Sequence, residues 1–262
     1  MMNLSQAIWI ETLKARRSKM PLLTALAFML APFAGGFFIF IMKDPELARR
    51  MGVISMKAQI VAGAADWPTF LSILVQAVAI GGFILFSLIA SWVFGREYAD
   101  HTVSDLLALP TPRTAIILAK FILFALWSAA LVLLITLVGL VVGWLLALPP
   151  VPAEIYWQGI IVIAITTFLT ILLIPPIAFF ASAGRGYLPP MAAAILALIL
   201  AQLLAAAGWG DYFPWSIPAL YSGMAGPDYA EIGWISFLIV LLTGLAGLIA
   251  TLAWWQMADQ TN

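Results

Sequence analysis

Six apolar runs constrain this chain more than any other feature. A bilayer core of about 30 Å needs about 20 helical residues to cross it, and every run reaches that length. None shows the alternation of apolar and polar residues that marks a strand of a membrane barrel, so all six are expected to be helices. The predicted fold class is an all-α polytopic membrane protein with spans at residues 21–42, 70–94, 114–148, 157–180, 188–207 and 233–255.

Composition excludes the main soluble alternatives. Hydrophobic residues make up 64% and charged residues 9% of the 262 positions, and the mean hydropathy is +1.08. Soluble domains are about 45–50% apolar and about 25% charged, and one of this size has too little interior to hide the excess. The formal net charge of +0 argues against a nucleic-acid partner. Because the chain contains no cysteine, disulfides and thiolate metal sites are excluded.

The basic residues favour a topology with both termini in the cytoplasm. Short cytoplasmic loops of membrane proteins carry an excess of Lys and Arg. With the N-terminus inside, the outer set is confined to one loop and comprises Lys43, Arg49, Arg50 and Lys57. The larger inner set comprises Lys14, Arg16, Arg17, Lys19, Arg96, Arg113, Lys120 and Arg185. Lys120 lies in the long third run, where we expect its ammonium group near the lipid headgroups.

Three further local features carry predictions. Residues 1–19 predict a short helix in the inner membrane interface, although a solvated tail fits them equally well. Residues 208–232 are rich in Pro, Gly and aromatic residues, and we interpret them as an outer segment that re-enters the bilayer. A kink is expected at Pro175 and Pro176, inside the fourth run.

The loop of residues 95–113 concentrates charge in a chain that is otherwise almost free of it. Thr102 and Asp105 have the spacing of a capping box at a helix start. Val103, Leu106 and Leu107 would then share one face of a short helix, which Pro110 and Pro112 would end. Such an apolar face on a loop helix needs a covering partner, so we predict a docking helix. A plain solvated connector is the alternative.

Several chemistries have no residues to perform them. The phosphate-binding pattern GxxxxGK[ST] does not occur, so no nucleotide site of that kind is expected. The single histidine, His101, rules out haem ligation by two histidines. Among the few polar residues inside the spans, Gln76 and Gln202 are the costliest to bury, and we assign them to a substrate path or a helix interface. Gly139 and Gly143 form a GxxxG pair that permits close helix approach.

The loop sequence resembles a known family. Residues 92–113 read WVFGREYADHTVSDLLALPTPR, followed by Ala119, Lys120 and Phe121. This pattern resembles the permeases of ABC-2 type ABC transporters, most of all the bacitracin-resistance and multidrug branch, as does YFPWSIP at residues 212–218. His101 departs from the pattern, because many members carry Gly before the Thr. The resemblance implies a cytoplasmic coupling helix between the second and third spans, whose ATPase-coupling residues here would be Glu97, Asp100, Thr102, Val103, Asp105, Leu106 and Leu107.

The resemblance also implies a function and partners. Residues 1–262 would form one transmembrane domain that pairs with a second permease subunit and with ABC ATPase subunits, which would hold ATP and Mg²⁺. The chain itself would have no catalytic, cofactor-binding or metal-binding residues. It would export an apolar or amphipathic substrate, such as a peptide antibiotic, lipid or drug, across the plasma membrane of a prokaryote. An ATP-independent membrane facilitator or scaffold is the alternative function.

Overall fold

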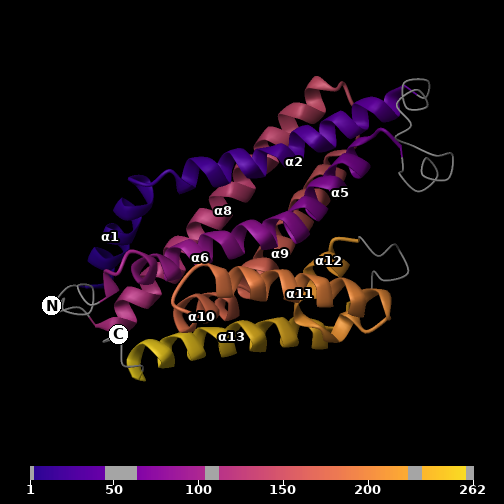
Figure 1. The fold of residues 1–262 in the computed structure, drawn as a ribbon. Coiled ribbons are helices and arrows are strands. Elements are labelled where there is room, and N and C mark those ends of the chain that lie inside the picture. Colours follow the sequence, from indigo (N-terminus) through magenta and orange to yellow (C-terminus); the bar gives the residue numbers. More distant parts are fainter. Residues whose placement is uncertain (1–2, 45–63, 104–111, 224–231, 258–262) are drawn as a thin grey trace.

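The computed structural model describes residues 3–44, 64–103, 112–223 and 232–257, and within these ranges the regular structure is entirely helical. Six helical segments are long and apolar enough to cross a membrane, which confirms the predicted fold class. They are Met20–Lys43, Trp67–Ala99, Arg113–Leu145, Ala153–Ala183, Leu188–Ala206 and Trp234–Met257. Figure 1 shows them as an elongated bundle, with the end of α13 and the N-terminal helix α1 at the same end. We call this the α1 end.

The first two helices are joined by a short turn. Helix α1 covers Leu4–Arg16 and begins where the Gln6 side chain accepts a hydrogen bond from the backbone N–H of Asn3, at 3.1 Å. Helix α2, Met20–Lys43, carries two apolar stripes at helical spacing. One is buried and includes Phe28 and Ile39, whereas the other is more than half exposed and includes Leu30 and Phe37. The exposed stripe fits a lipid-facing surface, because a bilayer is as apolar as the side chains themselves.

The second span is not a single α-helix. It runs as α5 (Trp67–Gln76), the π-helical turn η1 (Ala77–Gly82) and α6 (Phe83–Ala99). The side chain of Asp66 caps α5 by accepting a hydrogen bond from the backbone N–H of Thr69, at 3.0 Å. The sequence analysis did not predict the π-helical turn. Such turns occur mostly as single-turn interruptions of α-helices and frequently at functional sites.

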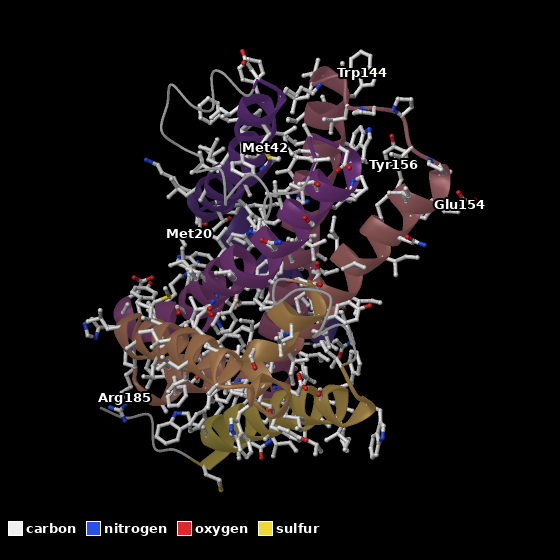
Figure 2. The ribbon with its side chains drawn as sticks, turned by 90° about the vertical axis from the view of Figure 1, so that its right-hand side faces the viewer. Met20, Met42, Trp144, Glu154, Tyr156 and Arg185 are labelled. Atoms are coloured by element: carbon white, nitrogen blue, oxygen red, sulfur yellow. The ribbon has the colours of Figure 1, made fainter. Side chains whose placement is uncertain are left out.

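The third and fourth spans differ in continuity. Helix α8, Arg113–Leu145, is unbroken, and it packs along α1 and α2. The fourth span consists of α9 (Ala153–Leu172) and α10 (Pro175–Ala183), and this break confirms the predicted kink at Pro175 and Pro176. Figure 2, viewed from the right-hand side of Figure 1, shows Trp144 and Tyr156 beside the turn that joins α8 to α9.

The last part of the chain packs around the broken fourth span. It contains α11 (Leu188–Ala206), the 3-10 turns η2 (Gly210–Tyr212) and η3 (Pro214–Ser216), α12 (Ile217–Tyr221) and α13 (Trp234–Met257). Helix α13 packs against α10 through Gly247, where a methyl group would meet the backbone at Pro175 and Pro176. Glycine is therefore required at this close approach of two backbones.

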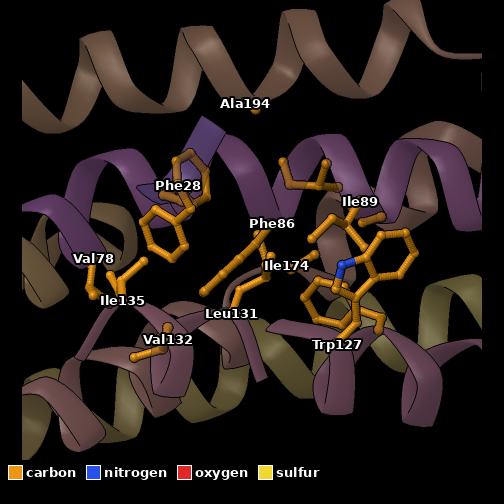
Figure 3. Packing of buried hydrophobic residues seen from close by; sticks show 14 of the residues in the cluster. Phe28, Val78, Phe86, Ile89, Trp127, Leu131, Val132, Ile135, Ile174 and Ala194 are labelled. Carbon is orange, nitrogen blue, oxygen red and sulfur yellow. The ribbon is translucent and has the colours of Figure 1, made fainter. Parts of the chain in front are cut away.

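A continuous apolar core joins the spans. Figure 3 shows Phe28 of α2, Phe86 of α6 and Leu131 of α8 packed together, with Ile174 from the break in the fourth span close by. Within the spans, the Trp127 indole N–H of α8 donates a hydrogen bond to the Thr24 hydroxyl of α2 at 3.2 Å. Gly139 and Gly143 lie against Leu74 and Trp67 of α5, so the predicted close helix approach at this pair is confirmed.

Candidate functional site: a buried charge network beside the predicted coupling loop

The predicted coupling loop leaves the second span through a tight turn at the α1 end. The backbone N–H of Thr102 donates to the carbonyl of Glu97 at 2.9 Å. His101 has a φ of 55°, in the left-handed region that glycine adopts without a steric cost. A histidine at this position therefore carries backbone strain.

Four charged side chains from three helices meet at this turn, and we call them the charge network. Lys120 of α8 lies 2.7 Å from a carboxylate oxygen of Glu97 on α6 and 3.4 Å from a carboxylate oxygen of Glu11 on α1. Lys14 of α1 lies 2.6 Å from Glu11 and 3.1 Å from Glu97. Two cations thus alternate with two anions, and the network ties α1, α6 and α8 together.

Three of the four network side chains are buried, whereas the Lys14 side chain is 24% exposed. Lys120 is fully buried, Glu97 is 3% exposed and Glu11 is 5% exposed. The Lys120 ammonium group also donates to the backbone carbonyl of Val93 at 2.6 Å. Desolvating charges is costly unless they are paired and hydrogen-bonded, and the alternating arrangement meets that condition for Lys120.

Two expectations about these residues are corrected by the structure. Lys120 was expected to reach the headgroups, but its ammonium group points into the protein because Glu11 and Glu97 neutralise it there. Glu97 was interpreted as a residue of the docking surface, yet it is buried beneath the turn and binds two lysines. Its second carboxylate oxygen is buried without a hydrogen-bond partner among the described residues. Any role of Glu97 in coupling is therefore indirect, through the position of the helices.

The other predicted coupling residues divide into three groups. Asp100 and Thr102 are exposed on the turn, and Asp100 lies 3.7 Å from Arg96. Val103 is 7% exposed, so it packs into the protein and does not stand free for a partner. Asp105, Leu106 and Leu107 lie outside the described residues, as does most of the predicted docking helix.

Arg113, at the far end of the loop, has a structural contact that the sequence analysis missed. Its guanidinium group donates to the backbone carbonyls of Trp255 and Gln256, at 2.9 Å and 3.5 Å. These are terminal carbonyls of α13, which have no partner inside their own helix. The start of α8 is thereby attached to the end of the last span.

Glu11 and Lys14 are the network residues that sequence reasoning missed. The spacing of Ala7, Glu11 and Ala15, one residue in every four, was a sequence signal for this face of α1. The structure shows that all three residues are buried. Small residues at that spacing indicate a helix face that approaches another helix closely. A carboxylate in the middle of such a face requires a cation on the facing helix, and Lys120 is that cation.

The predicted substrate-path residues are not brought together. Gln202 lines a cavity of about 320 Å³ between η1, α11 and the η3–α12 segment. Gln76 immediately precedes η1 and does not line this cavity. The η3–α12 segment belongs to the predicted re-entrant stretch. Its residues Trp215, Ser216, Ala219 and Leu220 share the cavity wall with Ala79 and Ile80. Those two residues lie well inside the second span, so the segment turns back along the spans.

The fold defines a class of protein: a polytopic helical membrane protein with a charge network where its second span ends. The chain belongs to the ABC-2 family of transporter proteins, whose family model matches residues 7–201. It is therefore a multi-pass membrane protein of an ABC transporter permease family, as the sequence resemblance implied.

A curated relative agrees with this family. The chain is similar to the bacitracin transport permease protein BCRB of Bacillus licheniformis, with 27% identity over 192 residues. The matched region covers 73% of this chain and 91% of that relative. No solved structure gives a significant match.

Proposed function

We propose that this chain is the permease subunit of an ATP-driven ABC exporter located in a prokaryotic plasma membrane. Membership of the ABC-2 family is the observation that carries the proposal. A separate ABC ATPase would bind ATP and Mg²⁺, and a second permease subunit would complete the pathway. Both termini would be cytoplasmic, because the basic residues favour that side.

The substrate would be an apolar or amphipathic molecule, such as a peptide antibiotic, a lipid or a drug. Bacitracin is the first compound to test, because the relative from Bacillus licheniformis is a bacitracin transport permease. Resistance of a sensitive host that expresses the permease together with its ATPase is the assay. Loss of that resistance when the permease is omitted would support export, and unchanged resistance would contradict it for bacitracin.

Coupling would pass from the ATPase through the 95–113 loop to the charge network. Leu106 and Leu107 would face the ATPase in the assembled complex. Their burial would contribute about 3–6 kcal/mol to the free energy of ATPase binding, before the cost of fixing the side chains at the interface is subtracted. Behind them, Glu97 and Lys120 would hold the end of α6 against α8 and α1, since they form the 2.7 Å pair. A movement imposed on the loop would then move three helices together.

The docking role is tested by replacing Leu106 and Leu107 with Asp in one variant. We expect this variant to insert and fold normally but to lose co-purification with its ATPase and to lose transport-linked resistance. Replacement of Leu106 and Leu107 with Met is the matched control, because it keeps both positions apolar at similar volume, and this variant should retain both properties. Recovery of the ATPase by the double variant at wild-type yield, with wild-type resistance, would identify the loop as a plain connector.

An ATP hydrolysis assay tests whether the ATPase subunit, and not the permease, hydrolyses ATP. The permease purified alone should hydrolyse no ATP above background, because it lacks the phosphate-binding loop. The reconstituted complex should hydrolyse ATP. Export that continues after the ATPase is deleted would favour the ATP-independent facilitator.

A further inference from the structure

Helix α1 has two opposite faces, and only one of them is covered by the rest of the protein. The buried face is the stripe of small residues around Glu11, which packs along α8. Trp9, Leu13 and Arg16 follow the helical spacing of i, i+4 and i+7 on the opposite face. Trp9 is 64% exposed, Leu13 is 37% exposed and Arg16 is also exposed. This outer face therefore combines large apolar side chains with a positive charge.

The position of α1 places its outer face at the edge of the bilayer. Helix α1 ends at Arg16, and the first membrane span begins at Met20. Glu11 of α1 contacts Lys120, which lies about two turns after the start of α8. Helix α1 therefore lies beside the first turns of α8 and not beyond its end. Figure 1 shows that α1 turns away from the line of α2 and crosses the α1 end of the bundle. This is the placement of a helix that lies along a membrane surface.

The positive charges at the end of α1 are not balanced by the described part of the chain. Arg16, Arg17 and Lys19 are all exposed, and we call them the basic cluster. Among the described residues, no carboxylate forms an ion pair with the cluster. The two carboxylates of the charge network bind Lys residues of that network, and Asp100 lies beside Arg96. The basic cluster is therefore complementary to an anionic partner from outside the chain.

We propose that α1 binds anionic phospholipid headgroups through the basic cluster, with Trp9 and Leu13 inserted at the boundary between headgroups and acyl chains. Basic residues next to a span attract anionic lipids, each by about fivefold in affinity, and indole rings favour this depth. The bound lipid holds α1 on α8, where the buried face of α1 supplies Glu11 and the charge network gains Lys14. Binding needs neither the ATPase nor a transported substrate, so its failure leaves the permease function standing.

Hydrogen exchange of the full-length permease in nanodiscs tests the proposal. One set of discs contains phosphatidylcholine alone, and the other contains in addition about 30% phosphatidylglycerol, which supplies the anionic headgroups. The amides of α1 should exchange at least about fivefold more slowly in the anionic discs, because bound lipid opposes release of the helix. The amides of α13, which carries no basic residue, should exchange equally in both. Raising the salt to about 1 M should remove most of the difference at α1.

Two variants separate the charge of the cluster from its shape. Replacement of Arg16, Arg17 and Lys19 with Gln should abolish the difference between the two kinds of disc. Replacement of Arg16 and Arg17 with Lys is the matched control, and it should keep the difference because the charge is unchanged.

Three results would overturn the proposal. The first is equal exchange of α1 in neutral and anionic discs for the wild-type protein, a comparison that does not depend on the folding of any variant. The second is equal slowing of α1 and α13, which would show a general effect of the bilayer. The third is a difference between discs that persists in the Gln variant. Loss of ATPase co-purification by the Gln variant, with no effect of lipid on α1, would assign the basic cluster to the ATPase instead.

Discussion

The α1 end of the bundle and the region around η1, α11 and α12 are stabilised by different means. At the α1 end, two carboxylates and two lysines bind one another, and Glu11, Glu97 and Lys120 are buried while Lys14 is partly exposed. Around η1, no charged side chain from the described ranges lines the cavity, and small residues leave an open volume. Paired buried charges tolerate few geometries, whereas a cavity between helices leaves room for rearrangement. The charge network lies where the second span ends, whereas the cavity lies deeper within the spans.

Removal of one charge of the network should lower the stability of the protein more than any other substitution considered. Lys120→Met leaves Glu97 and Glu11 buried with only Lys14 to balance them, and breaking a buried pair in this way costs about 3–5 kcal/mol. We expect a large fall in thermal stability in detergent, measured by loss of the monodisperse species on heating. The double variant Glu97→Gln with Lys120→Met leaves the Glu11–Lys14 pair balanced. It should recover most of the stability, and a double variant as unstable as the single one would contradict the charge-balance explanation.

Outside the charge network, loss of the close packing between α13 and α10 should cause the largest fall in thermal stability. In Gly247→Ala, the added methyl group would meet backbone atoms at Pro175 and Pro176, and overpacking of this kind costs about 1–3 kcal/mol. Gly81→Ala is the matched control, since nothing lies within 4 Å of the added group. Thermal stability should fall for Gly247→Ala, and it should stay the same or rise slightly for Gly81→Ala. Equal stability of the two would show that α13 does not depend on this approach.

Loss of the contact between Arg113 of α8 and the end of α13 should lower the stability least. Arg113→Met removes the hydrogen bond to the carbonyl of Trp255, and because Arg113 is half-buried we expect a loss of about 1 kcal/mol. Hydrogen exchange should accelerate in the last turn of α13 while the amides of α2 keep their protection. Acceleration spread evenly over both helices would contradict a local role for Arg113.

Much of the fold was predictable because a bilayer imposes simple length and hydropathy requirements. All six spans were found within a few residues of their ends, and the paired prolines marked the break in the fourth span. The π-helical turn was missed because η1 is as apolar as its flanks, so no change in composition marks it. The charge network was missed because Glu11 and Lys120 are 109 residues apart in sequence. Only the packing of α1 along α8 brings their charges together.

We propose that the charge network transmits movement from the predicted ATPase-docking loop to the spans. The most direct test applies two assays to the Glu97→Gln, Lys120→Met double variant: pull-down of the ATPase and the resistance of a sensitive host that expresses both subunits. We expect ATPase recovery at the wild-type level together with resistance no greater than that of the empty vector. Such a result would separate docking, which the loop surface provides, from coupling, which the buried pair provides. Full resistance with normal ATPase recovery would contradict the claim and reduce the network to a stabilising contact.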